Sequence, residues 1–276
     1  MVGAGHMGSG LGWALREAGN DVITSLEGRS PRSARLAGEA GLRLVPTLAG
    51  VVATAEVILV VTPPGAALDA ARAVAAVATG NHAVVVDLNA IAPSTSREVG
   101  AVIMKAGLDY VDGSISGPPP TVRPGANIYL SGSRANEIAT LQWKHVNPIV
   151  VGPTIGAASA VKMSTASVYK GMIGLLAQAM RAADAHGVLD IVLADLGTDL
   201  GSPYSVALAA TKAHRYVPEM LEIAKSQGSV GLTPALFEAL AAVWADVART
   251  PLAQGDPEAL DHQITGREVA DRLRQP

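Results

Sequence analysis

The sequence predicts an α/β protein in which a doubly wound parallel sheet is followed by an all-helical C-terminal domain. Two observations predict this class. As far as about residue 150, short apolar runs typical of buried parallel strands alternate with helical patterns. Beyond that point every pattern is helical, starting with a stretch over about 154–186 that no proline interrupts. We therefore expect an α/β domain at 1–152 and a helical domain at 153–276, joined by one long helix.

In the first domain, the expected strands and helices alternate along the chain. Gly19-Asn20 ends a first helix over 9–19, and the apolar run 56–61 is typical of a buried parallel strand. A Ser/Thr cap is expected to start a helix near Ser94. The other expected strands cover 21–26, 42–45, 83–87, 110–112 and 127–132, and the other helices 33–40 and 66–78. Only Met1-Val2 precede Gly3, so the first strand is nearly absent, and either the start is assigned late or this strand is clipped.

The helical domain is expected to continue beyond its long first helix over 188–199, 203–228, 233–250 and 257–273. Pro218 falls inside the second of these ranges and predicts a kink or a break there. Met172, Met180 and Met220 recur at helical spacings, which is typical of core residues.

The composition excludes several classes of function. The chain has 276 residues and no cysteine, which excludes disulfides, thiolate catalysis and Cys-ligated metal. A net charge of −3 gives no reason to expect nucleic acid or an anionic membrane as a partner. No uncharged apolar run reaches the roughly 18 residues that span a bilayer, and no signal peptide is recognised. A cytoplasmic protein is therefore expected.

A glycine-rich loop opens the first helix. Gly3-Ala4-Gly5-His6-Met7-Gly8 reads G-x-G-x-x-G, which is typical of a Rossmann-type dinucleotide-binding loop. Gly3 allows a tight turn, Gly5 lets the backbone approach a pyrophosphate, and Gly8 allows close contact between helix and strand. The helix N-terminus would hold the phosphates, with His6 bordering them. A glycine-rich turn without a ligand is the alternative.

Two further residues indicate which dinucleotide would bind. About 20 residues after the loop, an acid favours a free ribose 2′-hydroxyl and an arginine accommodates a 2′-phosphate. Arg29 and Ser30 supply a guanidinium and a hydroxyl for that phosphate, whereas Glu27 is the competing acid or points to solvent. We expect NADP as the cofactor, with NAD as the alternative.

Polar groups follow three of the expected strands, at the edge where ligands collect in an open α/β sheet. Thr62-Pro63 follows the run 56–61, and Asn89 follows the strand 83–87. Ser116-Gly117 offers a hydroxyl and backbone N–H groups to a carboxylate, and a turn demanded by the three prolines after it is the alternative. Asp112 is expected to be structural.

Lys162 is the candidate general acid/base. It lies among small residues at the start of the long helix, where the first turns are expected to line a cleft. Tyr169 falls on the same helix face and is either a second polar group of the site or a packing residue. For Lys162 the alternative is a solvated helix face.

In the helical domain, Arg215 is a candidate for binding a substrate anion, with a solvated helix face again as the alternative. The six histidines show no ligand spacing, so no metal site is expected.

Taken together, the motifs resemble the β-hydroxyacid dehydrogenase superfamily, which includes 3-hydroxyisobutyrate and 6-phosphogluconate dehydrogenases. The matching segments occur in order along the chain: GAGHMG at 3–8, VVTPPG at 60–65, DGSISG at 112–117 and GAASAVKM at 156–163. The helical tail looks most like a poorly characterised branch whose C-terminal region is related to phosphogluconate dehydrogenase. The resemblance covers the whole chain.

The resemblance implies a role for each matching position. It implies that the diphosphate is held by Gly3, Gly5, His6, Met7 and Gly8, the ribose by Arg29 and Ser30, the nicotinamide side by Thr62, Pro63 and Asn89, and a substrate carboxylate by Ser116 and Gly117. It also implies hydride transfer between the cofactor and a small hydroxy acid or carbonyl compound, with Lys162 exchanging the hydroxyl proton. A homodimer formed through the helical domain is a further implication.

The sequence departs from the family pattern at three points. Pro118 replaces a second glycine and removes an N–H, and Ala166 stands where an asparagine usually accompanies the lysine. The His-Asn pair of phosphogluconate enzymes is absent, which disfavours a sugar phosphate substrate. Two alternatives therefore stay open: an imine reductase, which commonly replaces the lysine, and an NADP(H)-binding sensor without turnover.

Overall fold

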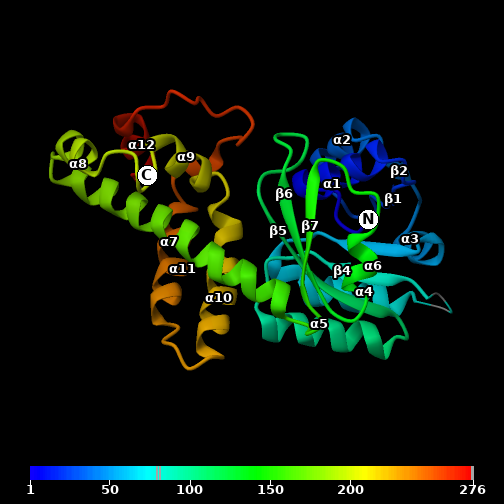
Figure 1. Cartoon of the computed structure of the whole chain (residues 1–276). Coiled ribbons are helices and arrows are strands. Elements are labelled where there is room, and N and C mark those ends of the chain that lie inside the picture. The colour runs from blue at the N-terminus through cyan, green and yellow to red at the C-terminus, as the bar shows by residue number, and fades with distance from the viewer. Residues whose placement is uncertain (79, 81, 275–276) are drawn as a thin grey trace. The chain divides into compact units, whose positions relative to one another are not determined.

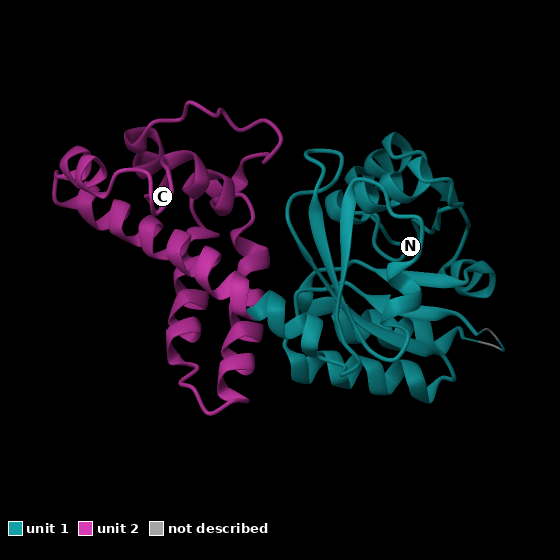
Figure 2. Ribbon diagram, viewed as in Figure 1, with its two compact units in different colours: residues 1–163 teal, residues 164–276 magenta. Residues whose placement is uncertain are grey.

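A computed structural model describes residues 1–78, 80 and 82–274. The chain divides into two compact units, Met1–Met163 and Ser164–Pro276 (Figure 2). The long helix predicted over about 154–186 is α7 (Ala157–Ala185), and its first turns belong to the first unit.

The first unit contains a sheet in which the order of the strands follows the sequence. Its strands are β3 (Val57–Val60), β4 (Val84–Asp87), β5 (Asp109–Ser116), β6 (Ala126–Ser131) and β7 (Val146–Gly152). The pairs β3–β4, β4–β5 and β6–β7 are parallel, and β6 runs antiparallel to β5. A doubly wound, mainly parallel sheet is thus confirmed, and the segment expected beside 110–112 is indeed its neighbour.

The short strands β1 (Ile23–Thr24) and β2 (Arg43–Leu44) form a parallel pair of their own. Met1 and Val2 connect this pair to the larger sheet. The N-terminal amine of Met1 donates to the carbonyl of Ile23 at 2.7 Å, and Val2 forms a parallel bridge with Val60. These two residues therefore lie between β1 and β3 and join the two sheets.

Helices cover both faces of this sheet (Figure 1). They are α1 (His6–Glu17), α2 (Pro31–Glu39), α3 (Leu48–Thr54), α4 (Ala67–Ala76), α5 (Pro93–Lys105) and α6 (Ala135–Ala139). One core contains Leu11 of α1 and Ile138 of α6, and the other contains Val74 of α4 and Ile103 of α5. The sheet is buried on both sides, which explains the continuous apolar runs of its strands.

The second unit is helical. After α7 it contains α8 (Leu189–Leu196), α9 (Pro203–Ala210), α10 (Ala213–Gly228), α11 (Ala235–Val247) and α12 (Gly266–Leu273). Met180, Met220 and Trp244 are fully buried, so the core positions predicted for two of the three methionines are confirmed, whereas Met172 is only partly buried. None of the helices among the described residues is long and apolar enough to cross a membrane.

Several expected element boundaries are wrong. The helix expected over 203–228 breaks at Thr211-Lys212, and Pro218 lies inside α10 without ending it. Pro218 comes early in α10, so the ring costs one intrahelical hydrogen bond while tertiary packing retains the helix. The last helix begins at Gly266 rather than 257, because a Thr265–Glu268 capping box defines its start.

The cap predicted near Ser94 is also wrong. Helix α5 starts with Pro93 at its first position after Ala92, and no side chain caps it.

Candidate functional site

The glycine loop has the geometry that its sequence predicts. Gly3 has φ +96°, and a Cβ there would lie 2.2 Å from the carbonyl oxygen of Val61. A Cβ on Gly8 would lie 1.9 Å from the carbonyl oxygen of Gly3. No atom lies within 4 Å of a Cβ built on Gly5, which is the residue before the first turn of α1. The fold therefore requires glycine at positions 3 and 8, whereas Gly5 leaves open space at a helix N-terminus, where a phosphate is favoured.

The segment after β5 lies against the same helix. A Cβ on Gly10 of α1 would meet the side chains of Pro119 and Pro120 at 3.1 and 3.2 Å. The prolines after Ser116-Gly117 thus contact the helix that starts at the glycine loop. The glycine loop and the Ser116-Gly117 turn, more than a hundred residues apart, therefore lie at the same edge of the sheet.

Asn89 and Thr62 are joined by a short hydrogen bond. The backbone N–H of Thr62 donates to Asn89 Oδ1 at 2.6 Å, and the buried Asn89 donates from Nδ2 to Asp87 at 3.1 Å. Burial raises the pKa of Asp87 to about 7, with the negative charge of Asp112 adding to this, while two hydrogen bonds from Asn89 oppose it. Asn89 therefore fixes the loop after β3 relative to β4.

Within the described part of the chain, two hydroxyls at this edge are buried and make no hydrogen bond. They are Oγ1 of Thr62 and Oγ of Ser94. A buried hydroxyl without a partner is costly, so these groups are suited to a polar ligand. Together with the space at Gly5, they fit a dinucleotide lying across the ends of the strands.

Asp112 is the centre of a buried hydrogen-bond cluster. The sequence predicted a structural role for this residue but not the cluster around it. Its Oδ2 accepts from Ser131 Oγ, Gly156 N–H and Ser159 N–H at 2.8, 3.0 and 3.1 Å. Its Oδ1 accepts from the hydroxyls of Ser96 and Ser159 at 2.7 and 2.6 Å. The carboxylate thereby fastens the beginning of α7 to the end of β5.

This attachment places Lys162 beside the predicted carboxylate site. Lys162 Nζ donates to the carbonyl oxygen of Ile115 at 2.8 Å, and Ile115 immediately precedes Ser116. Ser114 on the same strand donates from Oγ to the carbonyl of Ala158 at 2.8 Å. The side chain of Lys162 is partly buried at this contact.

The ribose candidates lie where α2 begins. Ser30 caps this helix, since its Oγ accepts from Ser33 N–H at 3.3 Å, and Arg29 is exposed just before the cap. Glu27 is also exposed. Arg29 is accessible to a ligand, whereas the Ser30 hydroxyl already has a structural role.

The remaining candidates belong to the second unit or to the turn after β5. Tyr169 is 72% exposed, and Arg215 is exposed on α10 and lowers the pKa of Lys212 and His214 by its charge, after the larger effect of their burial. Gly117 has φ +134°, and Pro118 beside it carries no N–H. Among the described residues, no group of three or more His, Asp or Glu side chains could hold a metal ion.

One sequence signal could have indicated the Asp112 cluster: serines recur in α5, at the end of β6 and at the start of α7. Ser96, Ser131 and Ser159 are all buried. Buried serines need partners, and a single carboxylate satisfies all three.

Comparison with known proteins agrees with this geometry. The model of the NAD binding domain of 6-phosphogluconate dehydrogenase matches residues 1–150, and a domain of unknown function, DUF1932, matches residues 183–247. An uncharacterized 28.5 kDa protein of Methanothermus fervidus is 24% identical over 244 residues, which cover 86% of this chain and 94% of that protein.

Solved structures show the same fold over nearly the whole chain. The conserved protein MTH1747, of unknown function and described as similar to 3-hydroxyacid dehydrogenases, is 29% identical, with 90% and 95% of the two chains covered and a TM-score of 0.64. The Mycobacterium tuberculosis 3-hydroxyisobutyrate dehydrogenase with L-serine is 18% identical, with 99% and 97% covered and a TM-score of 0.66.

An imine reductase from Myxococcus stipitatus in complex with NAD⁺ is 17% identical, with 99% and 98% of the chains covered and a TM-score of 0.54. At such identities these last two likenesses concern the fold alone. The domain model, in contrast, matches more than half of the chain. The protein therefore belongs to the family defined by the NAD-binding domain of 6-phosphogluconate dehydrogenase, within the β-hydroxyacid dehydrogenase superfamily.

Proposed function

We propose that this protein is an NADP-preferring oxidoreductase acting on a small hydroxy acid or the corresponding carbonyl compound, with Lys162 as general acid/base. The observation that carries the proposal is the contact of Lys162 Nζ with the Ile115 carbonyl, one residue before Ser116. It brings a candidate proton donor to the end of β5, and the prolines that follow this strand contact the helix that starts at the glycine loop.

Each candidate residue would have a separate role in the reaction. Bound NADP supplies the hydride acceptor or donor. Ser116 and the backbone at Gly117 would bind the substrate carboxylate, and Thr62, Pro63 and Asn89 would border the nicotinamide. In the oxidising direction Lys162 Nζ takes the proton of the substrate hydroxyl, and in the reducing direction it returns that proton to the carbonyl oxygen.

The preference for NADP rests on Arg29. Its exposed guanidinium stands just before the α2 N-terminus, where a 2′-phosphate would receive both a charged partner and the favourable end of the helix dipole. Exposed Glu27 would repel that phosphate, so the preference is expected to be moderate.

The second unit carries two further candidate residues and the proposed dimer interface. We propose that Tyr169 and Arg215 contribute polar groups to substrate binding, and that the protein forms a homodimer through its helices. Its partner would then be a small-molecule substrate rather than nucleic acid or a membrane, and a cytoplasmic location is consistent with this role.

The test is turnover by Lys162→Met with a panel of small hydroxy acids and NADP⁺. We expect a loss of kcat of about 10²–10⁴-fold with unchanged NADPH binding, because only proton transfer is removed. Lys144→Met is the matched control, since Lys144 lies on the surface of the same unit at 3.8 Å from Glu17. Equal turnover by both variants would contradict the assigned role.

The same panel separates the alternatives. The likeness to an imine reductase favours including cyclic imines with NADPH. Imine reduction that persists in Lys162→Met would identify an imine reductase. Tight NADP(H) binding with no turnover of any compound would favour a sensor.

A further inference from the structure

One aromatic contact of the first unit joins α1 to the start of β7. The rings of Trp13 and His145 stack with their centroids 4.8 Å apart and an angle of 13° between their planes. Trp13 belongs to α1, and His145 directly precedes β7, the edge strand of the sheet. The separation lies in the favourable range for stacked rings. The stack therefore connects the helix that starts at the glycine loop with the edge of the sheet.

His145 has an unfavourable backbone conformation at this contact. Its φ is +65°, and no other non-glycine residue in the described part of the chain has a positive φ. Such a conformation costs free energy that the surrounding contacts must offset, and it is enriched at functional sites. The stack on Trp13 is one of these contacts. Another is the carbonyl of His145, which accepts from the Gly125 N–H at 2.8 Å.

Gly125 ends the segment 117–125, which connects β5 to β6 and which we call the β5–β6 turn. Its first residue, Gly117, packs against the residue that follows the turn, since a Cβ on Gly117 would lie 2.9 Å from the Cα of Ala126. The beginning and the end of the turn thus lie against each other. The hydrogen bond from Gly125 to His145 therefore restrains Gly117 as well.

The middle of the β5–β6 turn contacts α1 directly. A Cβ on Gly10 would meet the side chains of Pro119 and Pro120 at 3.1 and 3.2 Å. Gly10 and Trp13 are three positions apart in α1, so they lie on the same face of this helix. That face contacts the turn at the prolines and, through His145, at the end of the turn. The turn is therefore held to α1 at two points.

The prolines increase the importance of Gly117. Residues 118–120 are all prolines, so Gly117 is the last residue with a backbone N–H before Thr121. Its φ of +134° is a conformation that favours glycine. An anion that binds at this end of the turn thus depends on the orientation of a single peptide group, which the rest of the turn must hold.

We propose that Trp13 and His145 are positioning residues for the carboxylate site. Their stack holds the β5–β6 turn against α1 and thereby sets the orientation of Gly117. This inference rests on the proposed function, in which Ser116 and Gly117 bind the substrate carboxylate. It adds that the affinity for a carboxylate depends on two rings that contact the opposite end of the turn.

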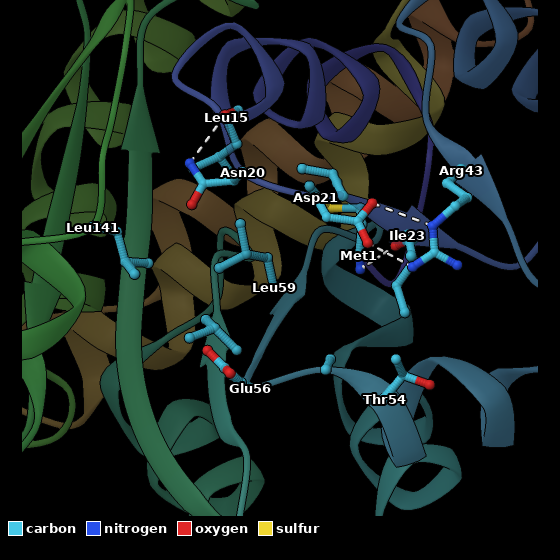
Figure 3. A pocket seen from close by; sticks show the side chains of 13 residues that line it. Met1, Leu15, Asn20, Asp21, Ile23, Arg43, Thr54, Glu56, Leu59 and Leu141 are labelled. Atoms are coloured by element: carbon cyan, nitrogen blue, oxygen red, sulfur yellow. Dashed lines mark hydrogen bonds and ion pairs between the residues drawn. The ribbon is translucent and has the colours of Figure 1, made fainter.

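The test compares wild type with Trp13→Leu, Trp13→Phe and His145→Gly. Trp13→Leu removes the stack, whereas Trp13→Phe keeps an aromatic ring in it. His145→Gly relieves the backbone strain but also removes the stack. Leu141→Ala is the matched control, because Leu141 lies in the same segment before β7 and packs against the same core as Trp13. Leu141 lines a cavity of about 340 Å³ that neither ring of the stack borders (Figure 3).

The first readout needs no ligand. Hydrogen exchange at the Gly125 amide reports whether the turn is held, because this N–H donates to His145. We expect exchange to accelerate by at least about fivefold in Trp13→Leu and His145→Gly, and to stay near the wild-type rate in Trp13→Phe and Leu141→Ala.

The second readout is the affinity for 3-hydroxypropanoate, a minimal carboxylate probe. Its Kd is measured from the shift of the Ser116 amide resonance in the presence of NADPH, which cannot oxidise the probe. We expect the Kd to rise about tenfold in the two variants without the stack, because the binding turn is no longer preorganised. It should stay within about twofold of wild type in Trp13→Phe and Leu141→Ala. A loss of stability alone would not produce this pattern.

Two results would overturn the proposal. One is exchange at Gly125 that is the same in wild type, Trp13→Leu and His145→Gly. The other is faster exchange with unchanged affinity for the probe, which would mean that the stack only stabilises the turn. A Ser116 resonance that does not respond to the probe in wild type would contradict the carboxylate site of the proposed function, and exchange at Gly125 would still decide whether the stack holds the turn.

Discussion

The two units bury charge in different ways. In the first, Asp112 accepts five hydrogen bonds from three serine hydroxyls and two backbone N–H groups. In the second, the buried Glu219 pairs with Lys170, whose ammonium lies 4.2 Å from the centre of the Tyr216 ring. Glu219 Oε1 and Trp244 Nε1 of the same unit are buried, and neither makes a hydrogen bond to the described residues. The difference indicates that the Asp112 cluster fixes a geometry, whereas the Glu219 pair is a replaceable part of a helical core.

Asp112→Ala should have the largest effect on stability. Alanine removes both carboxylate oxygens, so the buried N–H groups of Gly156 and Ser159, which can only donate, lose their acceptor. We expect a loss of about 3–5 kcal/mol in the free energy of unfolding, measured with urea. Asp109→Ala on the same strand is the control, because its exposed pair with Arg134 should contribute at most about 1 kcal/mol. A similarly small loss for both variants would show that the Asp112 cluster is not required for the fold.

The second prediction concerns the Glu219 pair. Glu219→Met alone leaves the largely buried Lys170 without its carboxylate and should cost about 3 kcal/mol. Lys170→Met/Glu219→Met should regain most of that loss, because an apolar pair replaces the ions in a helical core. The urea midpoints of the two variants decide this. A double variant as unstable as the single one would show that this pair, too, is structurally required.

The third prediction is a pH dependence from Asp87. Its pKa in the folded protein, about 7, lies above the ordinary value of 3.8, so the folded state holds the proton more tightly. Its contribution is therefore most favourable at low pH, is lost as the pH rises from about 4 to 7, and is constant above that. The loss is at most about 4 kcal/mol.

Asp87→Asn should remove this contribution, so the stability difference between pH 5 and pH 8 should shift toward higher relative stability at pH 8. Urea unfolding of wild type and variant at both values measures it. An identical pH dependence in the two proteins would show that Asp87 does not titrate in this range.

Much of the fold was predictable because local patterns determine it. The glycine loop, the buried strands and the long helix follow from periodicity and from positions where only glycine fits, such as Gly3 and Gly8. Sequence reasoning missed β7 and the helices α3 and α6. The two helices are short, with little periodicity to detect. The break at Thr211-Lys212 and the late start of α12 depend on capping and tertiary packing, which override propensity.

The sequence indicates candidate site residues by their types, but not how the structure connects them. The types and order of Lys162, Ser116 and Asn89 indicated their chemistry. Asp112 accepts hydrogen bonds from three serines, and Lys162 contacts the carbonyl of Ile115. These contacts join residues that are distant in sequence, so no local pattern reveals them. Whether Tyr169 and Arg215 act at the same site stays a prediction.

Fluorescence titration of NADPH and NADH tests the central claim, that the glycine loop holds a nicotinamide dinucleotide, most directly. The proteins to compare are wild type, Gly5→Val, Gly38→Val and Arg29→Ala. A Cβ at Gly5 or at Gly38 has open space around it, so both valine variants should fold. We expect Gly5→Val alone to abolish binding of both dinucleotides, and Arg29→Ala to weaken NADPH while sparing NADH. Unchanged binding by Gly5→Val would contradict the account.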